Sequence, residues 1–184
     1  MNKKLIPFLL ILIVVIGGGA WWMMKKNNVN IFSKSYDESL DPIFFNISFG
    51  MTRQAFYDTC WRLNKTGLFI QGGNNLSVQH DMQTEFGMPV YMNFYPDFSN
   101  DILYQMPVVY NYQSWSPWNR ELYSDTLIVR VIEKYEKDYN IKFTKKETED
   151  GRPAYYNYTG PRKILVTTRD EQYVKVLMEN ERYK

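Results

Sequence analysis

Residues 5 to 24 form a run of twenty residues without a charged side chain, LIPFLLILIVVIGGGAWWMM. As an α-helix this run would span about 30 Å, the thickness of the hydrocarbon core of a bilayer. Trp21 and Trp22 stand at one end, where aromatic rings favour the membrane interface, and two lysines follow them. The sequence therefore predicts a membrane anchor of one transmembrane helix within residues 1 to 26.

A cleaved secretory signal is the competing interpretation of the same segment. Gly18, Gly19 and Ala20 offer the small residues that a signal peptidase requires. The apolar run continues beyond them to Met24 and ends on lysines, which is typical of a stop signal. This continuation favours a signal anchor that the mature protein retains.

The charges on the two sides of the anchor predict its orientation. Lys3, Lys4 and the amino terminus precede the anchor, and the lysines that follow it are mixed with acidic residues. Acidic residues count little under the positive-inside rule, so the bias between the two sides is small. We expect a single-pass protein of the cell envelope whose short N-terminus stays in the cytoplasm and whose remaining chain is extracytoplasmic.

The chain beyond the anchor divides into two parts. Residues 27 to 42 are polar and lack periodicity, which predicts a tether. Residues 43 to 184 are enough for one ordinary hydrophobic core, so we expect a single domain there.

The spacing of apolar residues predicts the elements of this domain. Helical spacing predicts one helix over residues 52–66 and a second that starts at Trp118 or Ser124 and ends at Tyr139. Alternation predicts strands at 68–70, 76–80, 90–95, 102–112, 154–159, 164–168 and 173–178. Pro107 interrupts the longest strand, which indicates a sheet edge or a bulge. The order of elements predicts a two-layer α+β domain in which two helices cover one face of an antiparallel sheet.

Composition excludes several classes of function. Four of the 22 Lys and Arg residues flank the anchor, so the other 18 are outnumbered by the 20 Asp and Glu residues. A domain with this balance does not bind nucleic acid by bulk charge. A single cysteine and a single histidine cannot supply a four-ligand zinc site. We find no motif for a metal or a cofactor and expect neither.

Two residues could in principle be catalytic. His80 stands beside Asp81, and an imidazole oriented by a carboxylate can act as a general base. Cys60 could pair with this histidine, but it lies on the same helical stripe as Phe56 and Leu63, which favours a small buried residue. We therefore expect no catalytic residue, and a hydrolase centred on His80 is a distant third hypothesis.

Aromatic residues gather between residues 110 and 123, with amides and one arginine among them. Such a surface can stack on a sugar or form the hot spot of a protein interface. Its candidate ligand- or partner-binding residues are Tyr112, Trp115, Trp118 and Arg120. The alternative is that the aromatics cover the seam between helix and sheet. In that case we expect at least one tryptophan in the core, and Trp118 in particular, because it opens the predicted helix.

The stretch from Ser48 to Phe56, SFGMTRQAF, resembles the Gly-Met-Thr opening of a helix in small bacterial envelope proteins. The outer-membrane-assembly lipoproteins of the SmpA/OmlA type, with a fold related to the β-lactamase-inhibitor-like one, are one case. The resemblance covers nine of 184 residues and implies a protein-binding module. The lipid-bearing cysteine of that family has no counterpart close behind the anchor.

Two functions therefore remain in front. The first is a membrane-anchored extracytoplasmic module that binds a protein or assists assembly, without catalysis. The second is a carbohydrate or cell-wall binding module that uses the aromatics of residues 110–123. In both, the membrane is contacted through residues 5–24, and the further partner is an envelope protein or a glycan. Exposed and coplanar Trp115 and Trp118 would favour the second function, and buried ones the first.

Overall fold

The computed structural model describes residues 37–73, 77–83 and 85–184. The predicted anchor, residues 5–24, and most of the predicted tether lie outside these ranges. Among the described residues, neither helix combines the length and the apolar character needed to cross a bilayer. The chain from Glu38 to Lys184 forms one unit, which therefore includes residues before Ile43.

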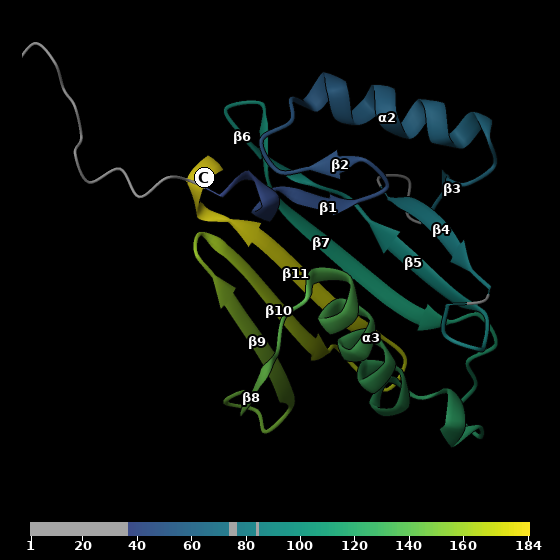
Figure 1. Ribbon diagram of the computed structural model, residues 1–184. Helices are drawn as coiled ribbons and strands as arrows, with labels where there is room; N and C mark the ends of the chain where they lie inside the picture. Colours follow the sequence, from purple (N-terminus) through teal and green to yellow (C-terminus); the bar gives the residue numbers. More distant parts are fainter. Residues whose placement is uncertain (1–36, 74–76, 84) are drawn as a thin grey trace, which may run out of the picture. The chain divides into compact units, whose positions relative to one another are not determined.

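The described residues form two α-helices, eleven strands and three short 3-10 helices (Figure 1). The helices are α2 (Arg53–Lys65) and α3 (Ser124–Tyr139), and the 3-10 helices are η1 (Glu38–Leu40), η2 (Arg120–Leu122) and η3 (Glu181–Tyr183). The first strands are β1 (Pro42–Phe44), β2 (Ile47–Ser48), β3 (Ile70–Gln71), β4 (Val78–Met82), β5 (Val90–Phe94) and β6 (Asp97–Ser99). The remaining strands are β7 (Ile102–Tyr112), β8 (Thr144–Glu147), β9 (Pro153–Thr159), β10 (Arg162–Thr168) and β11 (Val174–Asn180).

Nine of the strands form one antiparallel sheet in the order β3-β4-β5-β7-β11-β10-β9-β8, with β6 paired to β7. β1 and β2 form a separate hairpin. Figure 1 shows α3 lying across the middle of the sheet, where it contacts β7, β10 and β11. These observations confirm the predicted α+β class, with antiparallel sheets and two helices.

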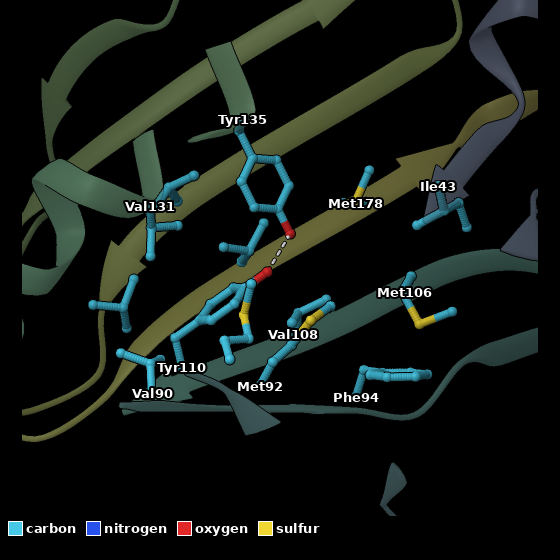
Figure 2. Packing of buried hydrophobic residues seen from close by; sticks show 14 of the residues in the cluster. Ile43, Val90, Met92, Phe94, Met106, Val108, Tyr110, Val131, Tyr135 and Met178 are labelled. Carbon is cyan, nitrogen blue, oxygen red and sulfur yellow. Dashed lines mark hydrogen bonds between the residues drawn. The ribbon is translucent and has the colours of Figure 1, made fainter. Parts of the chain in front are cut away.

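The core lies between the sheet and the layer formed by α3 and the β1–β2 hairpin (Figure 2). Alternate residues of β5, β10 and β11 are buried, as half-covered strands require, and β7 alternates in the same way from Met106 to Tyr110. Tyr110 of β7 and Tyr135 of α3 meet there through their hydroxyl groups. Ile43 of β1 also belongs to this cluster, so the β1–β2 hairpin covers the part of the sheet that lies beyond the end of α3.

The first helix forms as predicted but lies at the border of the sheet. The Thr52 hydroxyl accepts a hydrogen bond from the Ala55 backbone N–H at 3.2 Å, which caps the N-terminus of α2. Phe56 is fully buried, and its ring contacts Tyr95 and Phe98 around β6. α2 therefore packs where β5 and β6 meet, and of the two main helices α3 alone covers the middle of the sheet.

The expectation that Pro107 marks a sheet edge is wrong, and the nearest register shift lies between Leu103 and Gln105, in the pairing of β7 with β6. β7 lies between β5 and β11, and its pairing with β11 continues in register through Pro107 and Leu177. On its other side, β5 pairs with β7 only as far as Val108, and β6 begins at Gln105. Neither β5 nor β6 therefore pairs with β7 at Pro107, so a residue without a backbone N–H is tolerated there.

Candidate functional site

One face of the large sheet has no covering layer among the described residues. The buried residues of β10 and β11 point toward α3, and the residues between them are half-buried or exposed. Because opposite residues of an antiparallel pair share a face, the register assigns each residue of this open face to a row across the strands.

An apolar row crosses the centre of the open face. In register, Tyr156 of β9 lies opposite Leu165 of β10, Leu165 opposite Leu177 of β11, and Leu177 opposite Pro107. Tyr158 is 62% exposed, and its ring lies parallel to that of Tyr156, with the two centroids 6.2 Å apart. A shallow hollow of about 150 Å³ lies between these two tyrosines and the two leucines. One solvent-accessible patch, hereafter the apolar row, is thus formed by Tyr156, Leu165, Leu177 and Pro107.

Lysines border the apolar row. Lys146 and Lys175 lie in the adjacent row on one side, by their register with Ala154 and Thr167. In the part of the chain that the structure describes, neither of these two lysines forms an ion pair. Lys163 lies on the other side, next to Glu179, and each of these is neutralised by an ion pair. The border of the apolar row is therefore cationic toward Lys146 and Lys175.

The structure does not bring the four predicted binding residues into one exposed site. Tyr112 is buried, with its hydroxyl 3.4 Å from that of Thr126, and Trp115 is half-buried against Tyr123. Arg120 is exposed, and its guanidinium carbon lies 4.7 Å from the centre of the Tyr123 ring. No ring contact joins the two tryptophans within the described ranges.

The expectation that Trp118 lies in the core is wrong, since its side chain is 85% exposed. Leu122 and Tyr123 are buried instead, and the Tyr123 hydroxyl donates to the Pro117 carbonyl at 2.6 Å. This bond closes the loop before α3 with Trp118 on its outer side. The Trp115 indole nitrogen is buried and has no hydrogen-bond partner among the residues described.

His80 and Cys60 both have structural surroundings. The His80 ring is buried, with Nδ1 2.9 Å from the Leu68 carbonyl oxygen, and it contacts the Phe45 ring edge to face. Cys60 is half-buried rather than fully enclosed, and burial raises the pKa of its thiol to about 12. Within the described residues, no cluster of three His, Cys, Asp or Glu side chains could hold a metal ion.

Sequence reasoning missed the apolar row. The signal was present in the alternation of β10 and β11, because Leu165 and Leu177 occupy the phase that should be polar on a solvated face. Only the register shows that these residues and Tyr156 are neighbours.

Comparison with protein-family models, with curated proteins and with solved structures found no match to this chain. The resemblance of residues 48–56 to small envelope proteins therefore stays a prediction. In the structure this stretch leads from β2 into α2, with Gly50 at a φ of +82°.

Proposed function

We propose that this chain is a membrane-anchored extracytoplasmic module that binds another protein without catalysis. The anchor is the uncharged run of residues 5–24. The binding surface is the apolar row with its lysine border, and the partner is a protein with apolar side chains next to acidic ones.

The observation that supports this proposal most strongly is the uncovered apolar row on a regular sheet. Protein interfaces combine an apolar, aromatic centre with a polar border. Leu165, Leu177 and Tyr156 match the centre, and their backbone is fixed on both sides by neighbouring strands. A surface held in this way loses little conformational entropy when a partner binds.

Charge supports the choice of an acidic partner. Lys146 and Lys175 lie beside the apolar row, whereas Glu179 is already paired with Lys184 at 2.9 Å. An incoming carboxylate would therefore meet cations that no described acidic group neutralises. Complementary charge of this kind chiefly improves the rate and the specificity of association.

The surroundings of His80 and Cys60 support a function without catalysis. His80 is buried among aromatic rings, and its Nδ1 is engaged with a backbone carbonyl. The raised pKa of Cys60 leaves almost no thiolate near neutral pH, so its nucleophilicity is low.

Site-specific photo-crosslinking in the native membrane tests the proposal. A photoreactive residue replaces Leu177 on the apolar row in one full-length variant and Val129, an apolar residue 51% exposed on α3, in a second. We expect one discrete protein adduct from position 177 and no such adduct from position 129. The adduct should weaken when Lys146 and Lys175 are both replaced by Glu.

Three results would contradict the proposal. The first is the same set of adducts from both positions, since this would indicate unspecific contact. The second is an adduct at twice the mass of the chain, because it would indicate self-association. The third is an adduct that survives both lysine substitutions, which would reject an acidic partner.

A further inference from the structure

A second hollow, of about 460 Å³, opens on the β4–β5–β7 half of the same sheet face. The register gives Gln79, Asn93 and Val109 as one row of this half, and Tyr91 with Asn111 as the next row. All five residues line the hollow. Its floor is therefore made of neighbouring strands in the interior of the sheet, which fix the spacing of these side chains.

Tyrosine and amide side chains predominate in this hollow. The tyrosines are Tyr91, Tyr95 and Tyr173, and the amides are Gln79, Asn93 and Asn111. An amide has two N–H donors and an acceptor oxygen, and a tyrosine has an aromatic face and a hydroxyl group. Gln79 already donates one N–H to Asp81 at 2.9 Å, and the Tyr95 hydroxyl lies 2.9 Å from that of Tyr57. Asn111 is only 8% exposed, and its Nδ2 donates to the Tyr112 carbonyl at 3.1 Å, which orients this carboxamide.

The lining of the hollow carries little charge, and two residues of opposite charge stand beside it in the same rows, Asp81 opposite Tyr91 and Lys175 opposite Val109. Of its twelve described lining residues, only Arg169 has a charged side chain. Its Nε lies 3.0 Å from an oxygen of the Asp170 carboxylate, and its guanidinium carbon lies 3.9 Å from the centre of the Tyr173 ring. The positive charge of Arg169 is thus paired with Asp170, and its guanidinium group makes a cation–π contact with Tyr173. With Asp81 and Lys175 on opposite borders, the charges around the hollow offset one another, so net charge favours neither an anion nor a cation there.

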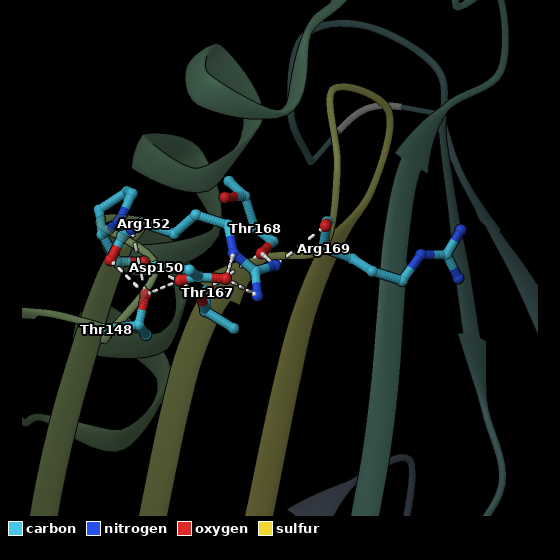
Figure 3. Close-up of polar contacts among 7 residues, drawn as sticks. Thr148, Asp150, Arg152, Thr167, Thr168 and Arg169 are labelled. Atoms are coloured by element: carbon cyan, nitrogen blue, oxygen red, sulfur yellow. Dashed lines mark hydrogen bonds and ion pairs between the residues drawn. The ribbon is translucent and has the colours of Figure 1, made fainter.

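The border of the hollow is held by contacts from outside it (Figure 3). The Arg152 guanidinium donates to the Thr168 and Arg169 carbonyls at 2.8 and 2.9 Å. These bonds attach the turn before β9 to the turn that precedes Tyr173. The Arg169 backbone N–H in turn donates to the Tyr173 carbonyl at 2.9 Å. This bond holds the backbone of Tyr173 beside that of Arg169.

Close packing also holds Asn93. A side chain at Gly72 would place its Cβ 2.9 Å from Asn93 Oδ1, so glycine lets this segment approach the amide closely. The Gly72 N–H donates to the Ser77 carbonyl at 2.9 Å. Glycine at position 72 therefore leaves the room that the Asn93 side chain occupies.

We propose that this hollow binds an uncharged saccharide. Aromatic faces accept the C–H faces of a pyranose ring, and rigid amides satisfy hydroxyl groups, which are donors and acceptors at once. The offsetting charges of Asp81 and Lys175 give a charged ligand no net advantage, and the amides disfavour lipid chains because these would leave them without hydrogen bonds. Pro107 borders both this hollow and the apolar row, but the residues varied in the two experiments differ, so either proposal can fail alone.

Binding of neutral oligosaccharides to the full-length protein tests this inference. The protein is kept in a zwitterionic detergent, because glycosidic detergents would compete for the site. Trisaccharides of glucose, mannose and N-acetylglucosamine are titrated and followed by ligand-observed nuclear magnetic resonance. A trisaccharide of glucuronic acid and a neutral extended hexapeptide serve as the competing ligand classes.

We expect at least one neutral trisaccharide to bind, and Tyr91→Ala to weaken it about tenfold or more. Asn93→Ala should weaken it by a similar factor. Tyr91→Phe keeps the ring and leaves no cavity, so it should retain most of the binding and guards against a folding defect. The matched control is Tyr158→Ala, which removes an exposed tyrosine from the other half of the same face and should leave the affinity unchanged.

Three outcomes would overturn the inference. The first is that none of the three neutral sugars binds. The second is that Tyr158→Ala weakens binding as much as Tyr91→Ala does. The third is that the uronic acid or the hexapeptide binds more tightly than any neutral sugar.

Discussion

Tyr110 of β7 and Tyr135 of α3 lie with their hydroxyl oxygens 3.1 Å apart in the core, where each side chain is at most 2% exposed. This hydrogen bond joins the covering helix to the central strand of the sheet. Tyr135→Phe should lower the free energy of unfolding by about 1 to 2 kcal/mol, because it leaves the buried Tyr110 hydroxyl unsatisfied. Urea unfolding of the full-length protein measures this loss. The double variant Tyr110→Phe/Tyr135→Phe should cost less than the sum of the single variants, and strict additivity would show that the hydroxyls do not interact.

The same tyrosines predict how stability depends on alkaline pH. Burial raises the pKa of Tyr110, Tyr135 and Tyr139 above the ordinary value, and in the unfolded chain they ionise near pH 10. The unfolded state therefore loses protons that the folded state keeps, so this stability is complete below about pH 10 and falls as the pH rises above it. Melting temperatures measured between pH 8 and pH 11 should show the fall. The double Phe variant should show a shallower one, and an equally steep fall would contradict this account.

Cys60 should react slowly in the folded protein. Burial raises its thiol pKa to about 12, so the folded protein holds far less thiolate at pH 8 than the unfolded chain does. Alkylation by iodoacetamide should be slower than in denaturant by roughly a hundredfold or more. Equal rates in the two states would show that the thiol is freely accessible.

Trp115 and Trp118 should differ in their effect on stability. Trp118→Ala removes an indole that is 85% exposed, so the free energy of unfolding should change by less than about 0.5 kcal/mol. Trp115→Ala removes half-buried contacts with Tyr123 and the core, and should cost about 1 to 3 kcal/mol. Thermal melts of the two variants compare them directly, and the reverse order would place Trp118 in the core after all.

Local patterns account for what the sequence predicts correctly. α2 begins at the cap formed by Thr52, and α3 ends at Asn140, which adopts a left-handed conformation at φ 50°. Strands β9, β10 and β11 follow the alternation of their apolar residues. β8 was missed because all four of its residues are exposed, so it has no alternation.

Properties that depend on distant partners could not be predicted in this way. Pro107 is tolerated inside the sheet because β5 and β6 leave an interruption opposite it. The exposure of Trp118 depends on Leu122 and Tyr123, which take the buried positions before α3. The apolar row exists only once the register places Leu165 beside Leu177.

The most direct test of the proposed function is the effect of Leu165→Glu on the photo-crosslinked adduct from position 177. Leu165 lies opposite Leu177 on the open face, so a carboxylate there would enter the interface centre without disturbing the core. We expect the adduct yield to fall about tenfold or more while the melting temperature changes little. Val129→Glu, which places the same charge on the exposed side of α3, should leave the yield unchanged. An undiminished adduct in the Leu165→Glu protein would contradict binding through the open face.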